Sequence, residues 1–416
     1  MSILNGIIIF VAKLLIMKLI DRPFYTEKIL PFIHKGLIIV LTGQRRVGKS
    51  CIMQQLKKEI DDDHSNVIYI NKEKTAFDFI KNYQELSAYV EGKLQADKEN
   101  YLLIDEVQEI AEFEKVLRSL QADDECHIIV TGSNAKMLSG ELATVIAGRY
   151  IDFHIQSLSY KEFLVFHRMD NNDQSLMNYL AYGGMPQLGN IGLDNVELVM
   201  DYLHTIYNTI VLRDVIARES IRNVPFLENL IRFVSDNIGK MISASSISKY
   251  MKSQQVDVSA NMILTYLDYF CNAFIINKVP RYDIHGKRLL ESNEKYYFED
   301  LGVRNTLADS DMMQSIEKLM ENAVYLHLKQ RGYRIFVGQF RQMEIDFVAK
   351  KGNATLYIQV TYLLASQETI EREFGNLKLI KDNYPKYVVS LDPLHCVSNY
   401  DGITHIHLRE FLMMDI

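Results

Sequence analysis

Residues 36–50, GLIIVLTGQRRVGKS, decide the fold of this chain. The run GLIIVLT is apolar on both faces and predicts a buried strand, and the residues from Lys49 onward predict a helix. Between them, Gly43 to Ser50 match the pattern G-x-x-x-x-G-K-[ST] in the required position after a strand and at the start of a helix. Backbone N–H groups and a helix N-terminus surround phosphate groups in such a loop, so we predict a phosphate-binding loop here.

The loop predicts a nucleotide site for ATP and Mg²⁺. We expect Lys49 to reach the β- and γ-phosphates and the Ser50 hydroxyl to ligate the metal ion. By position, the cofactor-binding set is Gly43, Gln44, Arg45, Arg46, Val47, Gly48, Lys49 and Ser50. We interpret the Arg45 and Arg46 side chains as structural or solvent-facing.

Outward from the loop, short apolar runs alternate with helical stretches. Four further runs predict strands, at 66–70, 101–105, 127–131 and 151–155. Helical segments such as 50–60 and 111–121 fill the gaps, which is the pattern of a doubly wound α/β sheet.

Polar residues follow the predicted strands, where they would face bound phosphates. Asp105 ends the strand YLLID, so its carboxylate is predicted to hold the metal ion, and Glu106 is predicted to activate the attacking water. Ser133 and Asn134 follow the next strand, in HIIVTGSNA, as candidate sensors of the γ-phosphate. The alternative for each of these residues is a helix cap.

The segment Ala147-Gly148-Arg149 supplies one further catalytic candidate. An arginine can stabilise the charge of the transition state, either within its own subunit or across a subunit boundary. The alternative is a surface arginine paired with a carboxylate.

These motifs carry a resemblance. GQRRVGKS, LLIDEVQ, VTGSNA, the AGR segment and LSYKEF resemble the AAA-type ATPase module of a bacterial and archaeal family that adds a C-terminal domain of unknown function. YGGMP, LRDV, YYFEDLGVRN and EIDFV resemble that C-terminal part. The resemblance implies an ASCE-type sheet, in which one strand lies between the phosphate-loop strand and the Asp-Glu strand, with Glu106 as the base.

From about residue 295 the order of predicted elements is α-β-β-β-α-β, which resembles the restriction-endonuclease-like PD-(D/E)XK fold. Glu321 and Asp346 match two metal-binding carboxylates of that fold, but Gln359-Val360-Thr361 replaces its (D/E)-x-K motif. We therefore expect no nuclease activity, because a carboxylate and the water-orienting lysine are missing. Glu344 and Asp346 share one strand face, which we interpret as solvated or partner-binding.

Residues 225–290 predict helices followed by a hairpin, which resembles a winged helix. Its expected recognition helix, SANMILTYLDYFCNAF, offers Asn261 but no lysine or arginine, and it contains Asp268. Because DNA-reading helices present such side chains to bases, docking between domains is the favoured role. The alternative is a phosphate-binding face made of Lys249, Lys252, Arg281, Lys287 and Arg288.

Composition limits the partners. The 416 residues carry a formal net charge of −7, which disfavours binding to nucleic acid or to an anionic membrane through bulk charge. Four cysteines without a close pair favour a reducing compartment, so we expect a cytoplasmic protein. The apolar stretch 3–20 contains two lysines and no clear signal-peptide features. It predicts a buried helix, a weak membrane tether or an extension outside a fold that starts near Met17.

We expect five parts: an apolar segment (1–20), an ATPase core (21–156), a helical lid (157–224), a winged-helix-like unit (225–294) and a nuclease-like domain (295–416). The expected function is Mg²⁺-dependent ATP hydrolysis that rearranges the C-terminal domains. One alternative is a non-hydrolysing nucleotide switch for a protein partner, and another is an ATP-regulated DNA-binding or DNA-processing protein.

Overall fold

The computed structural model describes residues 20–135, 146, 148–219, 221, 223–253, 255–308, 311–364, 366–392 and 399–416. Three features of the sequence analysis lie outside these residues: the N-terminal stretch up to residue 19, Ala147 of the arginine segment, and Cys396. Among the helices within the described ranges, none is both long enough and apolar enough to cross a bilayer.

A five-stranded parallel sheet forms the N-terminal part. Its strands are β1 (Ile38–Thr42), β2 (Ser65–Asn71), β3 (Glu99–Asp105), β4 (His127–Gly132) and β5 (Tyr150–His154), in the order β2-β3-β4-β1-β5. The expected P-loop topology is confirmed, because β4 lies between the phosphate-loop strand β1 and the Asp-Glu strand β3. All the carboxyl ends meet at one edge, where α/β sheets bind ligands.

Helices cover both faces of this sheet. They are α2 (Pro23–Ile29), α3 (Lys49–Ile60), α4 (Tyr83–Glu91) and α5 (Glu114–Ala122), with the 3₁₀ turns η1 (Leu30–Phe32), η2 (Thr75–Phe77) and η3 (Val107–Glu109). Strand β1 is buried along its whole length, and β3 and β4 are buried except near their beginnings, as the sequence predicted, whereas the edge strand β5 is partly exposed.

Helices follow, as expected, from residue 160 onward. They are α8 (Tyr160–His167), α9 (Asp173–Tyr182), α10 (Leu188–Ile191), α11 (Val196–Thr209), the π-helix η4 (Ile210–Ala217), α12 (Val224–Asp236), α13 (Ala244–Ser253) and α14 (Ala260–Asn272). Ser159 and Glu162 form a capping box at the start of α8 and so fix where that helix begins.

The C-terminal part is a mixed sheet of eight strands. They are β6 (Ile276–Asp283), β7 (Arg288–Phe298), β8 (Arg334–Phe340), β9 (Met343–Lys351), β10 (Ala354–Val360), β11 (Lys386–Ser390), β12 (Asn399–Tyr400) and β13 (Ile403–His407). The helical elements of this part are α15 (Leu301–Asn305), η5 (Met313–Ser315), α16 (Ile316–Gln330), α17 (Gln367–Lys378) and α18 (Leu408–Met413). The expected order α-β-β-β-α-β is present as α16-β8-β9-β10-α17-β11.

The hairpin β6–β7 departs from the expected division of the chain. We expected it to be a wing that ends before residue 295, but β7 continues across that position to Phe298. Strand β6 also pairs in parallel with β8, so the hairpin extends the C-terminal sheet. The winged-helix-like segment and the nuclease-like segment therefore share one sheet.

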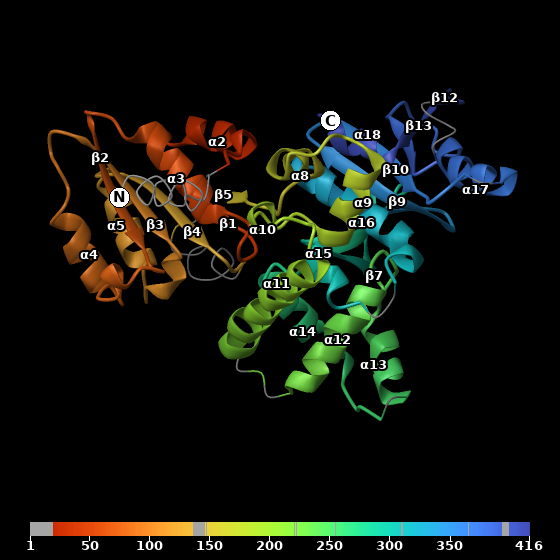
Figure 1. Ribbon diagram of the computed structural model, residues 1–416, viewed down its shortest axis with the longest axis horizontal. Helices are drawn as coiled ribbons and strands as arrows, with labels where there is room; N and C mark the ends of the chain where they lie inside the picture. The colour runs from red at the N-terminus through yellow and green to blue at the C-terminus, as the bar shows by residue number, and fades with distance from the viewer. Residues whose placement is uncertain are drawn as a thin grey trace, which may run out of the picture.

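The two sheets lie side by side, and helices α11 to α14 project below them (Figure 1). One apolar core runs from Tyr25 to Leu307 and joins the ATPase sheet to these helices. The motif YGGMP packs against YFED, since the Gly184 N–H donates to Asp300 Oδ2 at 2.8 Å. A side chain at Gly183 would collide with the same carboxylate, which explains the glycine.

Candidate functional site

The phosphate loop lies between β1 and α3, and two glycines make its path possible. Gly43 has a φ of 141°, and a Cβ there would lie 2.1 Å from the Ile155 carbonyl oxygen. Gly48, with a φ of 97°, occupies the N-cap of α3. Other residues adopt these positive φ values only with strain, so the tight turn in front of the helix requires glycine.

Lys49 holds its ammonium group inside the loop. Its Nζ donates to the carbonyl oxygens of Gly43 and Gln44, both at 3.0 Å, and the residue is buried. Burial lowers the pKa of Lys49, while the nearby Glu106 and Asp105 carboxylates oppose that shift. A buried ammonium whose hydrogen bonds within the described ranges go to carbonyl groups is well placed to pair with an incoming anion.

Asp105 ends β3 and is fully buried beside the loop. Its Oδ1 accepts from Thr131 Oγ1 at 2.6 Å, and its Oδ2 accepts from Asn71 Nδ2 at 3.3 Å. Burial raises the pKa of Asp105, and hydrogen bonds from the Thr131 and Ser50 hydroxyls act in the opposite direction. The carboxylate and the Ser50 hydroxyl, predicted to share a metal ion, are therefore neighbours.

Glu106 follows Asp105 in a left-handed conformation, with a φ of 58°. Its N–H donates to Thr131 Oγ1 at 2.9 Å, and its carboxylate accepts from Gln108. Thr131 thus fixes both acidic residues. Glu106 lines a pocket of about 610 Å³, together with Arg45, Arg46, Lys72, Glu73, Glu109, Asp214, Ala217 and Arg218.

Two buried polar side chains support a ligand in the loop. Both side-chain polar atoms of Gln44 are buried and have no hydrogen-bond partner in the described part of the chain. The same is true of Ser133 Oγ, which follows β4, and the adjacent Asn134 is buried as well. Because unpaired buried polar atoms are costly, these residues fit a polar ligand such as a nucleotide with its metal ion.

Arg45 pairs with a carboxylate of the helical part of the chain. Its Nε and Nη2 donate to the two carboxylate oxygens of Asp214 at 2.6 and 3.0 Å, and Asp214 is almost fully buried. Arg46 is exposed, with a φ of 67°. The pair with Asp214 agrees with a structural role for the Arg45 side chain, and the exposure of Arg46 agrees with a solvent-facing one. Both residues line the same pocket as Glu106, and their contribution to nucleotide binding stays a prediction.

Arg149 lies at the opposite edge of the sheet. Its carbonyl accepts from the N–H of Ile38, at the beginning of β1, whereas the phosphate loop follows the end of that strand. Five residues of strand separate the two ends by roughly 15 Å. A catalytic role for Arg149 within its own subunit is therefore wrong.

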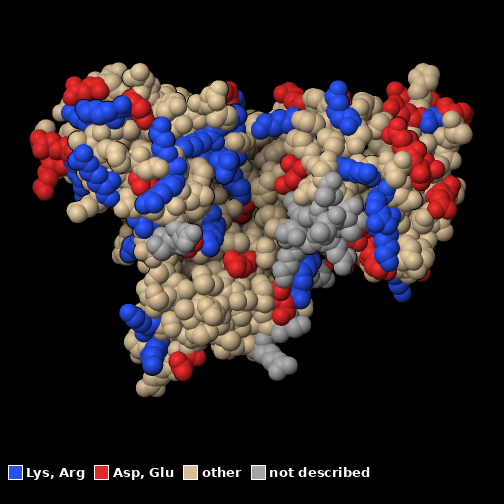
Figure 2. Space-filling view, turned by 180° about the vertical axis from the view of Figure 1, so that it is seen from behind, with Lys and Arg blue, Asp and Glu red and all other residues tan. Residues whose placement is uncertain are grey.

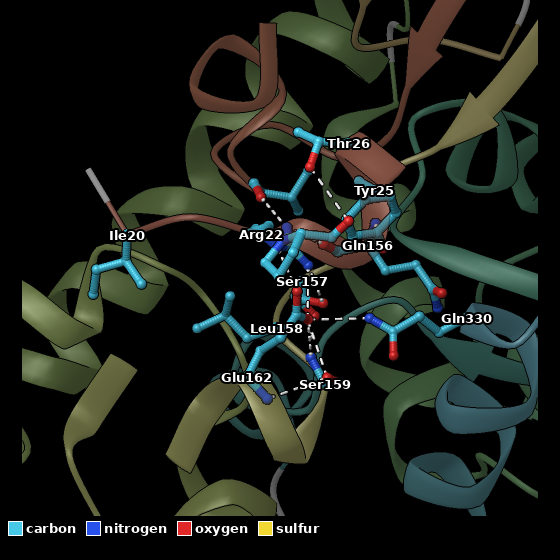
Figure 3. A network of polar contacts seen from close by, with 12 residues as sticks. Ile20, Arg22, Tyr25, Thr26, Gln156, Ser157, Leu158, Ser159, Glu162 and Gln330 are labelled. Atoms are coloured by element: carbon cyan, nitrogen blue, oxygen red, sulfur yellow. Dashed lines mark hydrogen bonds and ion pairs between the residues drawn. The ribbon is translucent and has the colours of Figure 1, made fainter. Parts of the chain in front are cut away.

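Arg22, which the sequence analysis did not single out, lies in a network of polar contacts with Gln156 and Glu162 (Figure 3). It is almost fully buried, and its Nη1 donates to the carbonyl oxygens of Val47 at 2.9 Å and Gln156 at 3.0 Å. Its Nε and Nη2 donate to the Glu162 carboxylate at 2.8 and 3.0 Å, and Gln330 of α16 donates to the same carboxylate. One guanidinium group thus connects the phosphate loop to α8 and, through Glu162, to the C-terminal part.

In the C-terminal sheet, a lysine lies among the carboxylates that include the two matched to the metal site of the nuclease fold. Lys295 Nζ lies 2.8 Å from Glu321 Oε1, 2.7 Å from Glu344 Oε1 and 3.7 Å from Asp346 Oδ1. Lys295 is almost fully buried, and the three carboxylates outweigh the effect of burial and raise its pKa. Glu344 and Asp346 therefore belong to an ion cluster around Lys295. Asp346 is buried, which corrects the solvated or partner-binding interpretation for that residue, whereas the Glu344 side chain is 42% exposed.

Comparison with family models matches two segments of the chain. Residues 35–164 match a family described as an AAA domain, which confirms the AAA-type assignment of the N-terminal part. Residues 173–314 match a domain of unknown function, DUF8612.

Solved structures give weaker likenesses. A Walker-type ATPase of Pyrococcus abyssi aligns with 69% of this chain and 96% of its own, at 14% identity and a TM-score of 0.48. The Orc1 protein of Aeropyrum pernix in complex with DNA aligns with 71% of this chain and 94% of its own, at 12% identity and a TM-score of 0.31.

Two relatives match over most of their length. An uncharacterised protein of Haemophilus influenzae is 33% identical over 403 residues, which cover 95% of this chain and 99% of the relative. The uncharacterised protein MJ1544 of Methanocaldococcus jannaschii is 31% identical and covers 83% of this chain and 79% of its own. The chain therefore belongs to the family of these two proteins, and its N-terminal part is an AAA domain.

Proposed function

We propose that the chain is a Mg²⁺-dependent ATPase. The observation that carries this proposal is the grouping of Lys49, Ser50 and Asp105 around one loop whose Gln44 side chain has no protein partner among the described residues. Lys49 would bind the β- and γ-phosphates, and Ser50 and Asp105 would hold the metal ion, whose role is to neutralise phosphate charge. Glu106 would accept the proton of the attacking water, and Ser133 and Asn134 would contact the γ-phosphate.

Phosphate release from ATP tests this proposal. We expect Lys49→Ala to abolish nucleotide binding, and Glu106→Gln to keep binding but to lower turnover at least 100-fold, because general-base catalysis contributes about 10²- to 10⁴-fold. Lys58→Ala is the matched control, since Lys58 is an exposed lysine on the same helix. Equal turnover by wild type and Lys49→Ala would reject the proposal.

The main alternative is a nucleotide switch. It predicts one bound ATP per chain and almost no phosphate release even when Glu106 is intact. The hydrogen bond from Gln108 to the Glu106 carboxylate is the observation that favours this alternative, because it occupies one oxygen of the carboxylate that would act as the base. Single-turnover measurements on wild type distinguish the two functions.

We further propose that the nucleotide state changes the arrangement of the C-terminal parts. Two contacts support this proposal. Arg45 of the phosphate loop pairs with Asp214 on η4, and Arg22 joins the loop carbonyl of Val47 to Glu162 on α8. A ligand that moves the loop would change the geometry of both ion pairs. A ligand shifts a conformational equilibrium through contacts that differ between the two states.

We infer that the nuclease-like domain, whose sheet includes β6 and β7, does not cleave nucleic acid. The donor set does not fit a catalytic divalent ion, because the ammonium group of Lys295 already lies among the carboxylates of Glu321, Glu344 and Asp346. Gln359 and Thr361 supply neither a carboxylate nor a lysine. This inference does not depend on ATP hydrolysis.

A protein is the partner that we propose for the helical part. On the face seen in Figure 2, the helices below the two lobes carry mainly uncharged side chains, and Lys and Arg gather on the lobes above. The exposed positions of α14 carry no positive charge and are Asn261, Met262, Leu264, Thr265 and Asp268. DNA remains the alternative partner, and stimulation of ATP turnover by DNA would favour it. The proposed setting is the cytoplasm, and a role for Arg149 across a subunit boundary would require an oligomer.

A further inference from the structure

Two histidines and a glutamate meet at the edge of the ATPase sheet that faces away from the nucleotide site. His34 lies in the turn between η1 and β1, Glu99 is the first residue of β3, and His127 is the first residue of β4. The last residue of β3 is Asp105 of the nucleotide site. The two ends of this seven-residue strand are roughly 20 Å apart, so the three residues form a separate cluster.

One carboxylate oxygen faces both imidazole rings. Glu99 Oε1 lies 3.2 Å from His34 Nδ1 and 2.9 Å from His127 Nε2. All three ligand atoms lie within 4.8 Å of one another. A tetrahedral ion about 2.0 Å from each ligand separates them by about 3.3 Å, so two of the three separations already match such an ion.

The surroundings hold these side chains in place. The Tyr101 hydroxyl donates to Glu99 Oε2 at 2.8 Å, which leaves Oε1 for the imidazoles. Tyr101 is the register partner of His127 across β3 and β4, and the two rings are 5.1 Å apart. The His34 and His127 rings meet edge to face at 4.8 Å. A second partner that orients a ligating carboxylate is typical of metal sites.

We propose that His34, Glu99 and His127 bind one zinc-class divalent transition-metal ion. Two imidazoles and a carboxylate form a donor set that suits zinc, whereas magnesium and calcium favour oxygen ligands. The side chains of His34 and Glu99 are 58% and 49% exposed, so solvent reaches the cluster and water completes the coordination. The ion joins the turn before β1 to the beginnings of β3 and β4, and so it stabilises this edge of the sheet.

Metal titration of the full chain without an affinity tag, after treatment with a chelator, tests the proposal. Zn²⁺ is titrated by calorimetry, and Co²⁺ is titrated with its visible spectrum recorded, because tetrahedral Co²⁺ absorbs strongly. We expect wild type to bind one equivalent of Zn²⁺ and its Tm to rise when Zn²⁺ is added. In the Co²⁺ titration we expect the visible absorption of histidine-ligated Co²⁺. His34→Ala, His127→Ala and Glu99→Gln should each weaken binding at least tenfold, and Tyr101→Phe should weaken it about tenfold.

His285→Ala is the matched control, since His285 is an exposed histidine on the β6–β7 hairpin. It should bind Zn²⁺ as wild type does. Binding should also persist with saturating Mg²⁺ and ATP, which separates this site from the nucleotide site. Wild-type Zn²⁺ affinity in the double variant His34→Ala/His127→Ala, or in Glu99→Gln if that double variant does not fold, would overturn the proposal. So would the absence of any Zn²⁺-dependent change in wild type.

Discussion

Two buried lysines of this molecule are held in opposite ways. Lys49 bonds to two backbone carbonyl oxygens, and its pKa is lowered mainly by burial. Lys295 is surrounded by three carboxylates, and its pKa is raised. The first ammonium still has charge to offer to an anion, whereas the charge of the second is already compensated. The same residue type therefore gives a binding group in one sheet and a structural group in the other.

Removal of the compensated lysine has a specific consequence. Lys295→Met leaves the Glu321 and Asp346 carboxylates buried without a cation, and breaking such a buried pair costs about 3–5 kcal/mol. We expect Tm to fall by about 5 °C or more. Mn²⁺ or Ca²⁺ should restore part of the loss, because a divalent ion can take the place of the ammonium group. Thermal melts with and without the metal ion measure both effects.

The matched control for that substitution is Lys278→Met on the neighbouring strand β6. Lys278 pairs with Glu294, but its own side chain is 40% exposed, so its loss should change Tm little. If Mn²⁺ raised the Tm of wild type as much as that of Lys295→Met, the lysine would not occupy the cation position.

Among the elements, α2 and η4 are small but connect distant parts of the chain. Helix α2 begins directly after Arg22, whose partner Glu162 lies 140 positions further along the chain. The π-helix η4 carries Asp214, which pairs with Arg45 across 169 positions. Both elements therefore position the phosphate loop without belonging to its motif.

The charge of Arg22 should be essential for stability. Arg22→Met leaves the Glu162 carboxylate without its cation and removes the donors to the Val47 and Gln156 carbonyls. Loss of one partner of a buried ion pair costs about 3–5 kcal/mol, so we expect a lower Tm together with a raised KM for ATP. Arg118→Met on the exposed face of α5 is the control. An unchanged KM would show that the network does not support the loop.

The pair between Arg45 and Asp214 should transmit the nucleotide state. In Asp214→Asn we expect ATP to bind, but the ATP-dependent change in hydrogen exchange over 196–236 should fall by at least half. Asp201→Asn, at an exposed position of α11, should behave as wild type. A full ATP response in Asp214→Asn would remove this pair from the proposed mechanism.

The sequence predicted those features that depend on neighbouring residues. The five strands of the first sheet, the phosphate loop and the α-β-β-β-α-β order all rest on local patterns, and the structure confirms each. The pairs made by Arg22, Asp214 and Lys295 were missed because each joins residues far apart in the chain. LRDV was noticed as a family motif, yet nothing in it shows that its aspartate faces Arg45. The pairing of β6 with β8 is also non-local, which is why the boundary expected at residue 295 falls inside β7.

At the scale of the whole molecule, a buried carboxylate lies where the two sheets meet. Glu299 accepts from His154 of β5 at 2.8 Å and pairs with Lys329 of α16. Burial alone would raise its pKa, but Lys329 and His154 outweigh burial and bring the pKa to about 2. The ordinary value is 4.5, so the folded state favours the ionised form.

This shift predicts a dependence of stability on pH. A depressed pKa contributes stability that is complete above pH 4.5 and is lost as the pH falls towards 2. The fall of this pKa from 4.5 to about 2 corresponds to roughly 3 kcal/mol. We expect Glu299→Gln to lower Tm at pH 7, and the gap from wild type to narrow progressively between pH 4.5 and pH 3. Melts across this range measure the gap, and an exposed control, Glu59→Gln, should show no gap at any pH.

The continuous core from Tyr25 to Leu307 has a consequence for how this protein can evolve. Exchange of an AAA domain alone, cut at residues 35 and 164, would leave behind Arg22 and the helices that share its apolar surface. The new junction would expose that apolar surface. It would also separate Arg22 from Glu162 and Arg45 from Asp214. Recombination should therefore succeed only when the AAA domain and the helices packed against it are inherited together. Compensating substitutions should occur in pairs, with one member on each side of the junction.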